Sequence, residues 1–342
     1  MKIVICDYYE DLQRDLNFEK ELLTRGLNNP EIAVYEYKGD KAELIDVISD
    51  ADAIINTYVD LDREILSGAA SLKCIALNAV GYNMVDVDAA TEMGIMVCPA
   101  REYCTEEVAE HTIAMILSLG RGFKRYIRDI ETNHVWNYMA AGKIERLAGK
   151  TLGILGFGKI GRAVAKRAAA MNMNIIALKR KSIRPEIAEA MNVRLTDEEE
   201  IWANADYICN HMSLNEETTG YFNLERFKKM RKHPFFINLG RGLSVVEDDL
   251  VEALDKGYIR GAGLDVLSSE SPDLDNLKLL GRDNVIITPH AGFYSLQAAR
   301  DLQEISCNSV IYALNGDIDK IAGVINLAAL NGSAAFRSSQ SR

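Results

Sequence analysis

The sequence predicts an α/β protein with two doubly wound parallel-sheet domains. Its N-terminal part contains short apolar runs separated by helical patterns, and a second block with the same alternation begins near residue 150. Strands that alternate with helices are typical of a parallel sheet covered by helices on both faces. The chain has 342 residues, a length that suggests two domains with separate cores.

Each expected strand is a short apolar run. The N-terminal block contains Lys2–Cys6, Ala53–Asn56, Lys73–Leu77 and Ile95–Cys98. The second block contains Thr151–Leu155, Asn174–Leu178, Asp206–Cys209, Phe235–Asn238, Ala262–Val266 and Val285–Ile287. Between the blocks, Glu106–Leu119 is apolar nearly all round, which predicts a helix buried in a domain seam or a subunit interface. A long helix is expected over Leu296–Leu314, and residues 331–342 are expected to form a disordered tail.

The composition excludes several classes of protein. The formal net charge is -11 and no basic face is evident, so nucleic acid is not an expected partner. The six cysteines form no C-x-x-C pair and several lie in apolar runs, so we expect buried, reduced thiols and no metal site. The N-terminal apolar run is too short for a signal peptide, and the longest apolar stretch, Ile113–Leu119, is too short to cross a bilayer. We therefore expect a cytoplasmic protein without a membrane partner.

A glycine motif follows the strand expected at Thr151–Leu155. It is Gly156-Phe157-Gly158-Lys159-Ile160-Gly161, and a helical run over Arg162–Met171 comes next. In such a context the first glycine permits a tight turn, the second lets the backbone approach a pyrophosphate, and the third allows close helix–strand packing. Free N–H groups and the positive dipole end of the helix favour the phosphates. The motif therefore predicts a dinucleotide-binding Rossmann domain.

The residues after the second strand of this domain indicate which dinucleotide is bound. An acidic residue about twenty residues beyond the motif usually holds the ribose 2′-hydroxyl of NAD(H). Here the strand ends at Leu178 and continues with Lys179, Arg180 and Lys181. Cations at this place pair with a 2′-phosphate, which a carboxylate would repel. The sequence favours NADP(H), with NAD(H) as the alternative if Lys179 and Arg180 only face solvent.

Several sequence blocks occur in an order that is specific in combination. They are Asn78–Asp86 (NAVGYNMVD), Val108–His111 (VAEH), Leu147–Gly161 (LAGKTLGILGFGKIG), Phe236–Gly242 (FINLGRG), Gly261–Val266 (GAGLDV) and Thr288–Gly292 (TPHAG). With these blocks the sequence resembles the D-isomer-specific 2-hydroxyacid dehydrogenase family, from about residue 40 to Asn326. The resemblance implies a Rossmann domain, residues 101–294, inserted into a discontinuous flavodoxin-like substrate domain, residues 1–100 and 295–330. The cleft would lie at the hinge.

Three residues are expected to carry the chemistry. Reduction of a 2-oxo acid needs a group that holds the carboxylate, a polarised carbonyl, and a proton that arrives as hydride reaches carbon. Arg241 resembles the family's substrate-binding arginine, whose guanidinium fork can hold carboxylate and carbonyl oxygens together. His290 follows a strand at the edge where ligands bind and resembles the general acid–base. Glu270 resembles the carboxylate that fixes the tautomer of the histidine and stabilises the imidazolium.

The resemblance also implies binding residues. Cofactor contacts beyond the glycine motif and the two cations are expected from Ser213, Thr218, Leu239, Gly240 and Asp265. Asp265 would accept from the nicotinamide carboxamide, and Ser213 stands where the family often has proline. Of the remaining histidines, His211 matches a position near the adenine and His111 is expected to be structural.

Substrate contacts are expected from the other domain. By resemblance, the backbone N–H groups of Val80 and Gly81 would bind the substrate carboxylate. Tyr103 matches a tyrosine that lines the substrate pocket in the D-lactate dehydrogenase branch, and Tyr58 lies on another strand-to-helix loop. Both tyrosines could equally be packing residues.

The expected function is hydride transfer between NADP(H) or NAD(H) and a small 2-oxo acid or (R)-2-hydroxy acid. The side chain of that acid is not specified by the sequence. One alternative is a dinucleotide-sensing corepressor, because such proteins share this fold and keep the Arg–Glu–His triad. Another is a short phosphoglycerate dehydrogenase. A homodimer is expected from the helix Glu106–Leu119, the arm around Trp136 and the family resemblance.

Overall fold

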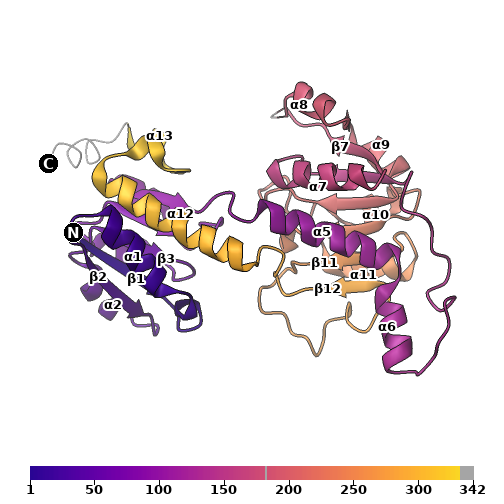
Figure 1. The fold of residues 1–342 in the computed structure, drawn as a ribbon, viewed down its shortest axis with the longest axis horizontal. Helices are drawn as coiled ribbons and strands as arrows, with labels where there is room; N and C mark the ends of the chain where they lie inside the picture. Colours follow the sequence, from indigo (N-terminus) through magenta and orange to yellow (C-terminus); the bar gives the residue numbers. More distant parts are fainter. Residues whose placement is uncertain (182, 332–342) are drawn as a thin grey trace. The chain divides into compact units, whose positions relative to one another are not determined.

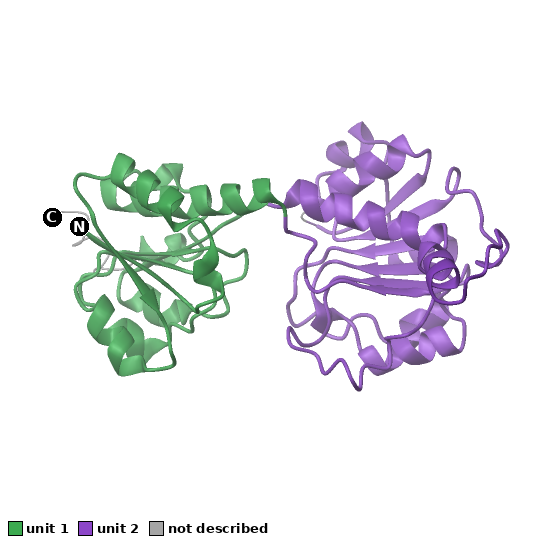
Figure 2. Ribbon diagram, turned by 60° about the horizontal axis from the view of Figure 1, so that its bottom comes forward, with its two compact units in different colours: residues 1–103, 295–342 green, residues 104–294 purple. Residues whose placement is uncertain are grey.

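The computed structural model describes residues 1–181 and 183–331 as two compact units (Figure 2). Unit 1 contains Met1–Tyr103 and the chain from Ser295 onward, and unit 2 contains Cys104–Tyr294. Of the tail expected over residues 331–342, all but Asn331 lies outside the described residues.

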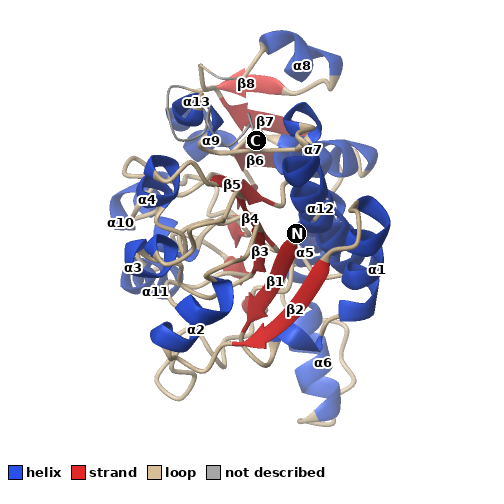
Figure 3. Ribbon diagram, turned by 90° about the vertical axis from the view of Figure 1, so that its left-hand side faces the viewer, coloured by secondary structure: helices blue, strands red, loops and turns tan. Residues whose placement is uncertain are grey.

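The sheet of unit 1 has five parallel strands in the order β2-β1-β3-β4-β5 (Figures 1 and 3). The strands are β1 (Lys2–Asp7), β2 (Glu31–Glu36), β3 (Ala53–Asn56), β4 (Cys74–Leu77) and β5 (Met96–Pro99). This order is that of the flavodoxin-like fold. Four strands lie where the apolar runs predict them. β2 is missing from the prediction because it is an edge strand, none of whose residues is fully buried.

Helices cover both faces of this sheet. α1 (Leu16–Gly26) and α12 (Leu296–Asn315) pack on one face, which makes the unit discontinuous in sequence. α2 (Lys41–Ile48), α3 (Arg63–Ser67) and α4 (Val87–Glu92) pack on the other, and α13 (Leu327–Leu330) follows α12. The first four helices each begin after an aspartate whose carboxylate accepts N–H bonds from the first turn, namely Asp15, Asp40, Asp62 and Asp86.

The sheet of unit 2 has seven parallel strands in the order β12-β11-β10-β9-β6-β7-β8. They are β6 (Thr151–Leu155), β7 (Asn174–Leu178), β8 (Arg194–Thr196), β9 (Tyr207–Asn210), β10 (Phe235–Asn238), β11 (Gly261–Leu264) and β12 (Val285–Ile287). The order reverses between β6 and β9, as in a doubly wound dinucleotide-binding domain. The sequence predicted six of these strands. β8 escaped prediction because it is a three-residue edge strand that begins with an exposed arginine.

The helices of unit 2 also form two layers. α5 (Thr105–Gly120) and α7 (Lys159–Ala170) lie together on one face. α9 (Glu198–Asn204), α10 (Leu224–Lys229) and α11 (Glu247–Asp255) cover the other face around a core that contains Trp202 and Phe227. α6 (Phe123–Glu131) follows α5, and α8 (Pro185–Ala190) packs beside β8. α7 begins at Lys159, within the glycine motif, rather than at Arg162 as predicted.

One face of α5 is buried within unit 2, and the opposite face is not. Val108, Met115 and Leu119 are buried, and the helix packs on α7, β10 and β11. Ala114 and Leu117 are exposed, so the helix is not covered all round within this chain. The sequence predicted burial in a domain seam or a subunit interface, and burial of the exposed side in a subunit interface stays a prediction.

All six cysteines are buried and free, as their apolar surroundings predict. The Sγ atoms of Cys74 and Cys98, on neighbouring strands, lie 3.8 Å apart. Among the described residues, no helix combines the length and the apolar character needed to span a membrane.

Candidate active site

The predicted functional residues of unit 2 gather at one edge of its sheet. Because all the strands are parallel, the loops that follow them share the carboxyl edge, where ligands bind in doubly wound folds. These loops contain Gly156–Gly161 after β6, Lys179 and Arg180 after β7, Ser213 and Thr218 after β9, Leu239–Arg241 after β10, Asp265 after β11, and His290 after β12. Glu270 lies farther along the loop that follows β11.

The three glycines of the motif occupy three different environments. Gly156 has φ +95°, and a Cβ there would lie 2.4 Å from the carbonyl carbon of His211. A Cβ on Gly161 would lie 2.3 Å from the carbonyl oxygen of Gly156, so the start of α7 packs directly on the turn. Next to Gly158 a Cβ would meet no atom within 4 Å. The open side of the loop is therefore at Gly158, where a pyrophosphate is expected to approach.

Backbone N–H groups at the start of α7 are available to a ligand. In the first turn of the helix, the N–H of Arg162 donates to Gly158 O (3.0 Å). The N–H groups of Gly158 and Ile160 have no acceptor among the described residues, and no side chain caps the helix. Phe157 is buried beneath the loop. Together with the open side at Gly158, these free donors fit the phosphates of a dinucleotide.

The cations predicted beside the ribose lie just after β7. The side chains of Lys179, Arg180 and Lys181 are exposed, and the N–H of Lys179 donates to Thr196 O (2.8 Å) on β8. No carboxylate stands in this segment, so nothing in the loop itself would repel a 2′-phosphate.

The loop after β9 is fixed by its own hydrogen bonds. The hydroxyl of buried Thr218 donates to Ser213 O (2.7 Å), and the N–H of Thr218 donates to Asn215 Oδ1 (3.1 Å). His211 is half-buried, but both of its ring nitrogens are buried and have no hydrogen-bond partner among the described residues. Burial lowers the pKa of His211 to about 4. The structure thus brings Ser213 and Thr218 together in one rigid turn.

His290 and Glu270 form a pair. The Nδ1 atom of His290 lies 2.9 Å from Glu270 Oε2. The ring of Phe293 stands edge-on to the imidazole, with the two ring centres 5.9 Å apart. The Nε2 atom of His290 has no hydrogen-bond partner among the described residues. Because the carboxylate engages Nδ1, Nε2 is the atom left to exchange a proton with a bound molecule.

Asp265 holds the loop that carries His290. Its Oδ1 accepts from the Thr288 hydroxyl (2.5 Å) and the Ala291 N–H (2.9 Å), and its Oδ2 accepts from the Gly292 N–H (2.9 Å). Its carbonyl accepts from the His290 N–H (2.8 Å). These bonds keep His290 in a left-handed conformation with φ +50°, which a non-glycine residue adopts only when its surroundings impose it.

His111 joins the same network. Its Nε2 lies 3.0 Å from the Thr288 hydroxyl and 3.7 Å from Asp265 Oδ1. The sequence predicted a structural role for His111 but not this contact, which crosses from α5 to the loop after β12. The position of His111 in the VAEH block was the one sequence feature that could have indicated a role at the site. The carboxylate of Asp265 is thus largely engaged by its own unit, and its predicted contact with the cofactor stays a prediction.

Arg241 is fixed by a pair of buried asparagines at the ends of β9 and β10. The side chain of Asn210 donates to Asn238 Oδ1 (2.9 Å), and Asn238 Nδ2 donates to Arg241 O (3.1 Å). Within the part of the chain that the structure describes, the guanidinium donates one bond, to Gly240 O (2.8 Å). A Cβ on Gly242 would lie 1.7 Å from Leu267 O, so this glycine is required for the chain to pass. Most donors of the guanidinium remain available for a ligand.

The buried side chain of Leu239 packs against the His290 loop. A Cβ on Gly292 would lie 3.1 Å from a methyl group of Leu239 and 2.7 Å from Asp265 Oδ2. Gly240 is similarly confined, because a Cβ there would lie 3.0 Å from the Asn210 side chain. The loops after β10, β11 and β12 therefore form one tightly packed group.

The residues predicted to bind substrate lie at the carboxyl edge of the unit 1 sheet. Tyr58 follows β3 and is exposed, whereas Tyr103, after β5, is half-buried. Val80 and Gly81 follow β4; Val80 is exposed and Gly81 is half-buried, and neither N–H donates to an acceptor in the described part of the chain. These free N–H groups can donate hydrogen bonds to the carboxylate of a ligand.

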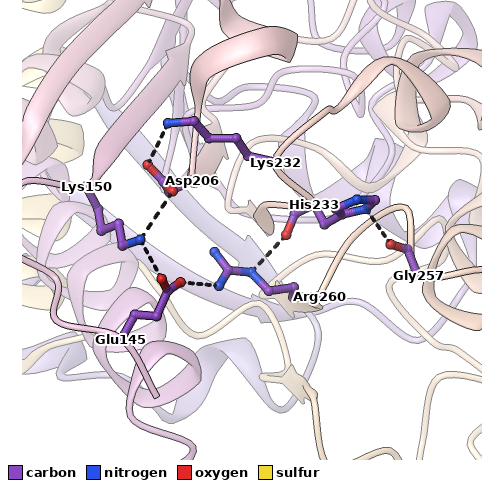
Figure 4. Close-up of a pocket in the computed structure, with 7 residues that line it drawn as sticks. All are labelled: Glu145, Lys150, Asp206, Lys232, His233, Gly257 and Arg260. Atoms are coloured by element: carbon purple, nitrogen blue, oxygen red, sulfur yellow. Dashed lines mark hydrogen bonds and ion pairs between the residues drawn. The ribbon is translucent and has the colours of Figure 1, made fainter. Parts of the chain in front are cut away.

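A cavity of about 510 Å³ lies at the opposite, amino edge of unit 2 (Figure 4). Lys150, Asp206 and Arg260 directly precede β6, β9 and β11. Glu145 pairs with Lys150 (2.9 Å) and Arg260 (2.9 Å), and Asp206 pairs with Lys232 (3.3 Å). Because its charges are paired and it lies at the edge away from the glycine motif, this cavity is not part of the predicted site.

Known proteins share these features. Residues 113–292 match the family model described as D-isomer specific 2-hydroxyacid dehydrogenase, NAD binding domain. A hydroxypyruvate reductase of Blautia hydrogenotrophica is 34% identical, covering 92% of this chain and 98% of that protein. A glyoxylate reductase of Thermofilum pendens is 33% identical, covering 84% of this chain and 86% of that protein.

A solved structure agrees with these relatives. The crystal structure of a D-lactate dehydrogenase from Aquifex aeolicus, complexed with NAD and lactic acid, aligns with a TM-score of 0.79 at 29% identity. The alignment covers 94% of this chain and 98% of that one. The two sheet orders, the glycine cradle formed by Gly156–Gly161, and these similarities show that the chain belongs to the D-isomer specific 2-hydroxyacid dehydrogenase family, whose members are oxidoreductases that bind a nicotinamide dinucleotide.

Proposed function

We propose that this protein catalyses hydride transfer between a nicotinamide dinucleotide and a small 2-oxo acid or (R)-2-hydroxy acid. One observation carries the proposal: the His290–Glu270 pair, with Nε2 open, lies at the same sheet edge as the glycine cradle and Arg241. The names of the relatives support a small substrate, because they include reductases of hydroxypyruvate and of glyoxylate.

The proposed proton path uses the two ring nitrogens of His290. The bound reduced cofactor supplies the hydride. The Nδ1–H of His290 donates to Glu270, which stabilises the imidazolium, and the Nε2–H delivers its proton to the carbonyl oxygen as C2 becomes tetrahedral. One 2-oxo acid, one hydride and one proton give one 2-hydroxy acid. In the reverse direction, Nε2 accepts the hydroxyl proton.

Two groups are proposed to hold the substrate carboxylate. Arg241 presents a planar fork of donors, of which the structure uses one for Gly240 O. In unit 1, the free N–H groups of Val80 and Gly81 are proposed to bind the carboxylate, and Tyr58 and Tyr103 to line the substrate pocket. Asp265, through its bonds to the 288–292 loop, is proposed to keep His290 in position.

We also propose a preference for NADP(H). Support comes from the exposed cations Lys179 and Arg180 at the place where NAD-dependent members carry a carboxylate. The cofactor would further contact Gly156–Gly161, Ser213, Thr218, Leu239, Gly240 and Asp265. Because the cations are exposed, salt screens their charge, and the preference is expected to be moderate.

A homodimer is proposed from the exposed apolar surface of α6 and the arm after it. Phe123 and Ile127 on α6 are exposed, and on the arm Trp136 is 90% and Tyr138 86% exposed. An apolar surface of this kind usually marks a protein interface. Light scattering at micromolar concentration should give twice the mass of one chain, and a monomer would contradict the proposal.

A substrate panel tests the proposed reaction. Oxidation of NADPH and of NADH is followed with glyoxylate, hydroxypyruvate, pyruvate and branched 2-oxo acids. We expect turnover with at least one acid, faster with NADPH at low salt. Dinucleotide binding without turnover of any of these acids would favour the dinucleotide-sensing alternative.

A further inference from the structure

A buried network of charged and polar side chains lies at the carboxyl edge of the unit 1 sheet. Its members come from the end of β1, from α1 and α12, and from the loops around them (Figure 1). They are Asp7, Arg14, Glu19, Thr57, Asn78, Gln303 and Ser306, all buried except Arg14, which is half-buried. None of them takes part in the proposed hydride transfer.

Asp7, the last residue of β1, clamps the loop after β3. Its Oδ1 accepts from the N–H groups of Thr57 (2.7 Å) and Tyr58 (3.3 Å), and its Oδ2 accepts from the Thr57 hydroxyl (2.8 Å). The Nη1 of Arg14 also donates to Oδ2 (2.8 Å). Asp7 therefore fixes the backbone of Tyr58, one of the residues proposed to line the substrate pocket.

Arg14 extends the network to the loop after β4. Its Nε donates to Glu19 Oε1 (2.6 Å) on α1. In the amide orientation that satisfies both of its ends, Asn78 Oδ1 accepts from Arg14 Nε and Nη2 (3.2 Å each) and Nδ2 donates to Ser306 Oγ (2.6 Å) on α12. Asn78 stands two residues before Val80. One guanidinium thus links the clamp on Tyr58 to the start of the Val80–Gly81 loop.

Stability alone does not explain why these charges are buried. The network sets two carboxylates against one guanidinium, and Glu19 Oε2 is buried without a hydrogen-bond partner among the described residues. Burying charge is costly, and apolar side chains of similar volume often stabilise a fold at least as well. What an apolar cluster would not supply is a directional connection between the two loops.

We propose that Arg14 is a positioning residue that, through Asp7 and Asn78, sets the geometry of the two loops that bind the substrate. The inference rests on the proposed function, because those loops are assigned to the substrate there. Since they contact the substrate in the ground state and the transition state alike, their displacement raises KM more than it lowers kcat.

Arg14→Met is the test variant, and Arg25→Met is its matched control. Arg25 lies on α1, and its one ion pair among the described residues is an exposed one with Glu21. For Arg14→Met we expect KM for the 2-oxo acid to rise at least about tenfold, with kcat within about threefold. Dinucleotide affinity should be unchanged, because the glycine cradle belongs to unit 2. Arg25→Met should match the unmodified protein in each measurement.

A second readout does not depend on turnover. Amide hydrogen exchange of Thr57 and Tyr58, measured by NMR, should accelerate at least about tenfold in Arg14→Met, because their acceptor Asp7 loses its partner. If Arg14→Met does not fold, Arg14→Lys serves, since it keeps the positive charge but cannot reach Asp7, Glu19 and Asn78 together.

The outcomes are distinct. A lower melting temperature with unchanged KM and unchanged exchange would make the network purely structural and would overturn the inference. Faster exchange with unchanged KM would also overturn it, because the substrate would then not depend on these loops. If the unmodified protein reduces no 2-oxo acid, the proposed function fails, and unchanged exchange in the variant would separately refute the connection between Arg14 and the loop.

Discussion

Two alanine substitutions in the glycine cradle should separate ligand binding from packing. The cradle presents its open side at Gly158, with φ −77°, and its crowded side at Gly161. Gly158→Ala adds a Cβ that meets no protein atom within 4 Å, so the melting temperature should stay within about 1 °C. The same Cβ occupies the space where a pyrophosphate must approach. Dinucleotide affinity should therefore fall at least about tenfold, or about 1.4 kcal/mol.

Gly161→Ala should have a large effect on stability. Its Cβ would lie 2.3 Å from Gly156 O, so α7 or the turn must move by about 1 Å to restore an ordinary contact. Overpacking of this size costs about 1–3 kcal/mol. In a domain of this size each kcal/mol lowers the melting temperature by about 2–4 °C, which gives a loss of about 2–12 °C.

Calorimetry and fluorescence titration with NADPH and NADH measure the two effects. Each variant serves as the control for the other, because both add one methyl group, at positions three residues apart. Undiminished dinucleotide affinity in Gly158→Ala, at an unchanged melting temperature, would mean that the open side of the loop does not face the cofactor.

Three further predictions concern single functions of the site. His290→Ala should lower kcat by about two to four orders of magnitude with dinucleotide affinity retained, and turnover near that of the unmodified enzyme would remove His290 from the mechanism. Lys179→Asp combined with Arg180→Ala should lower the ratio of kcat/KM with NADPH to kcat/KM with NADH by about tenfold or more. In the unmodified enzyme this ratio should fall as the salt concentration rises. A higher kcat/KM with NADH than with NADPH at low salt in the unmodified enzyme would contradict the cofactor preference. Burial lowers the pKa of His211 from 6.5 to about 4, so the unfolded chain takes up the proton first as the pH falls, and stability is lost between these two pH values. His211→Gln should therefore reduce the fall in unfolding free energy between pH 6.5 and 4. An equal dependence of unfolding free energy on pH in both proteins would contradict this prediction.

The fold was largely predictable because its central strands are buried on both faces. Such strands must be nearly continuous apolar runs, as at Ala53–Asn56 and Phe235–Asn238, and these runs are visible without any tertiary information. β2 and β8 are edge strands with exposed charged residues such as Glu31 and Arg194, which interrupt the apolar run; the edge strand β5 is buried throughout and was predicted. The glycine cradle was also predictable, because its geometry depends on residues close together in the sequence.

Contacts between distant parts of the chain were not predictable. Nothing local to His111 indicates that it meets Thr288, which is 177 positions away. The same holds for the buried network of unit 1, where Glu19 accepts from Gln303 (3.0 Å) across 284 positions. Such polar pairs leave no periodic pattern, because each member needs only one partner brought to it by the fold.

Deuterium transfer tests whether hydride passes from the cofactor to C2 of the substrate. The enzyme is supplied with NADPH or NADH that carries deuterium at both C4 positions of the nicotinamide, and with the 2-oxo acid that it reduces fastest. We expect the label transferred from the cofactor at C2 of the hydroxy acid, a product of R configuration, and slower formation of that product in His290→Ala. Product without deuterium at C2, or of S configuration, would contradict the proposed reaction.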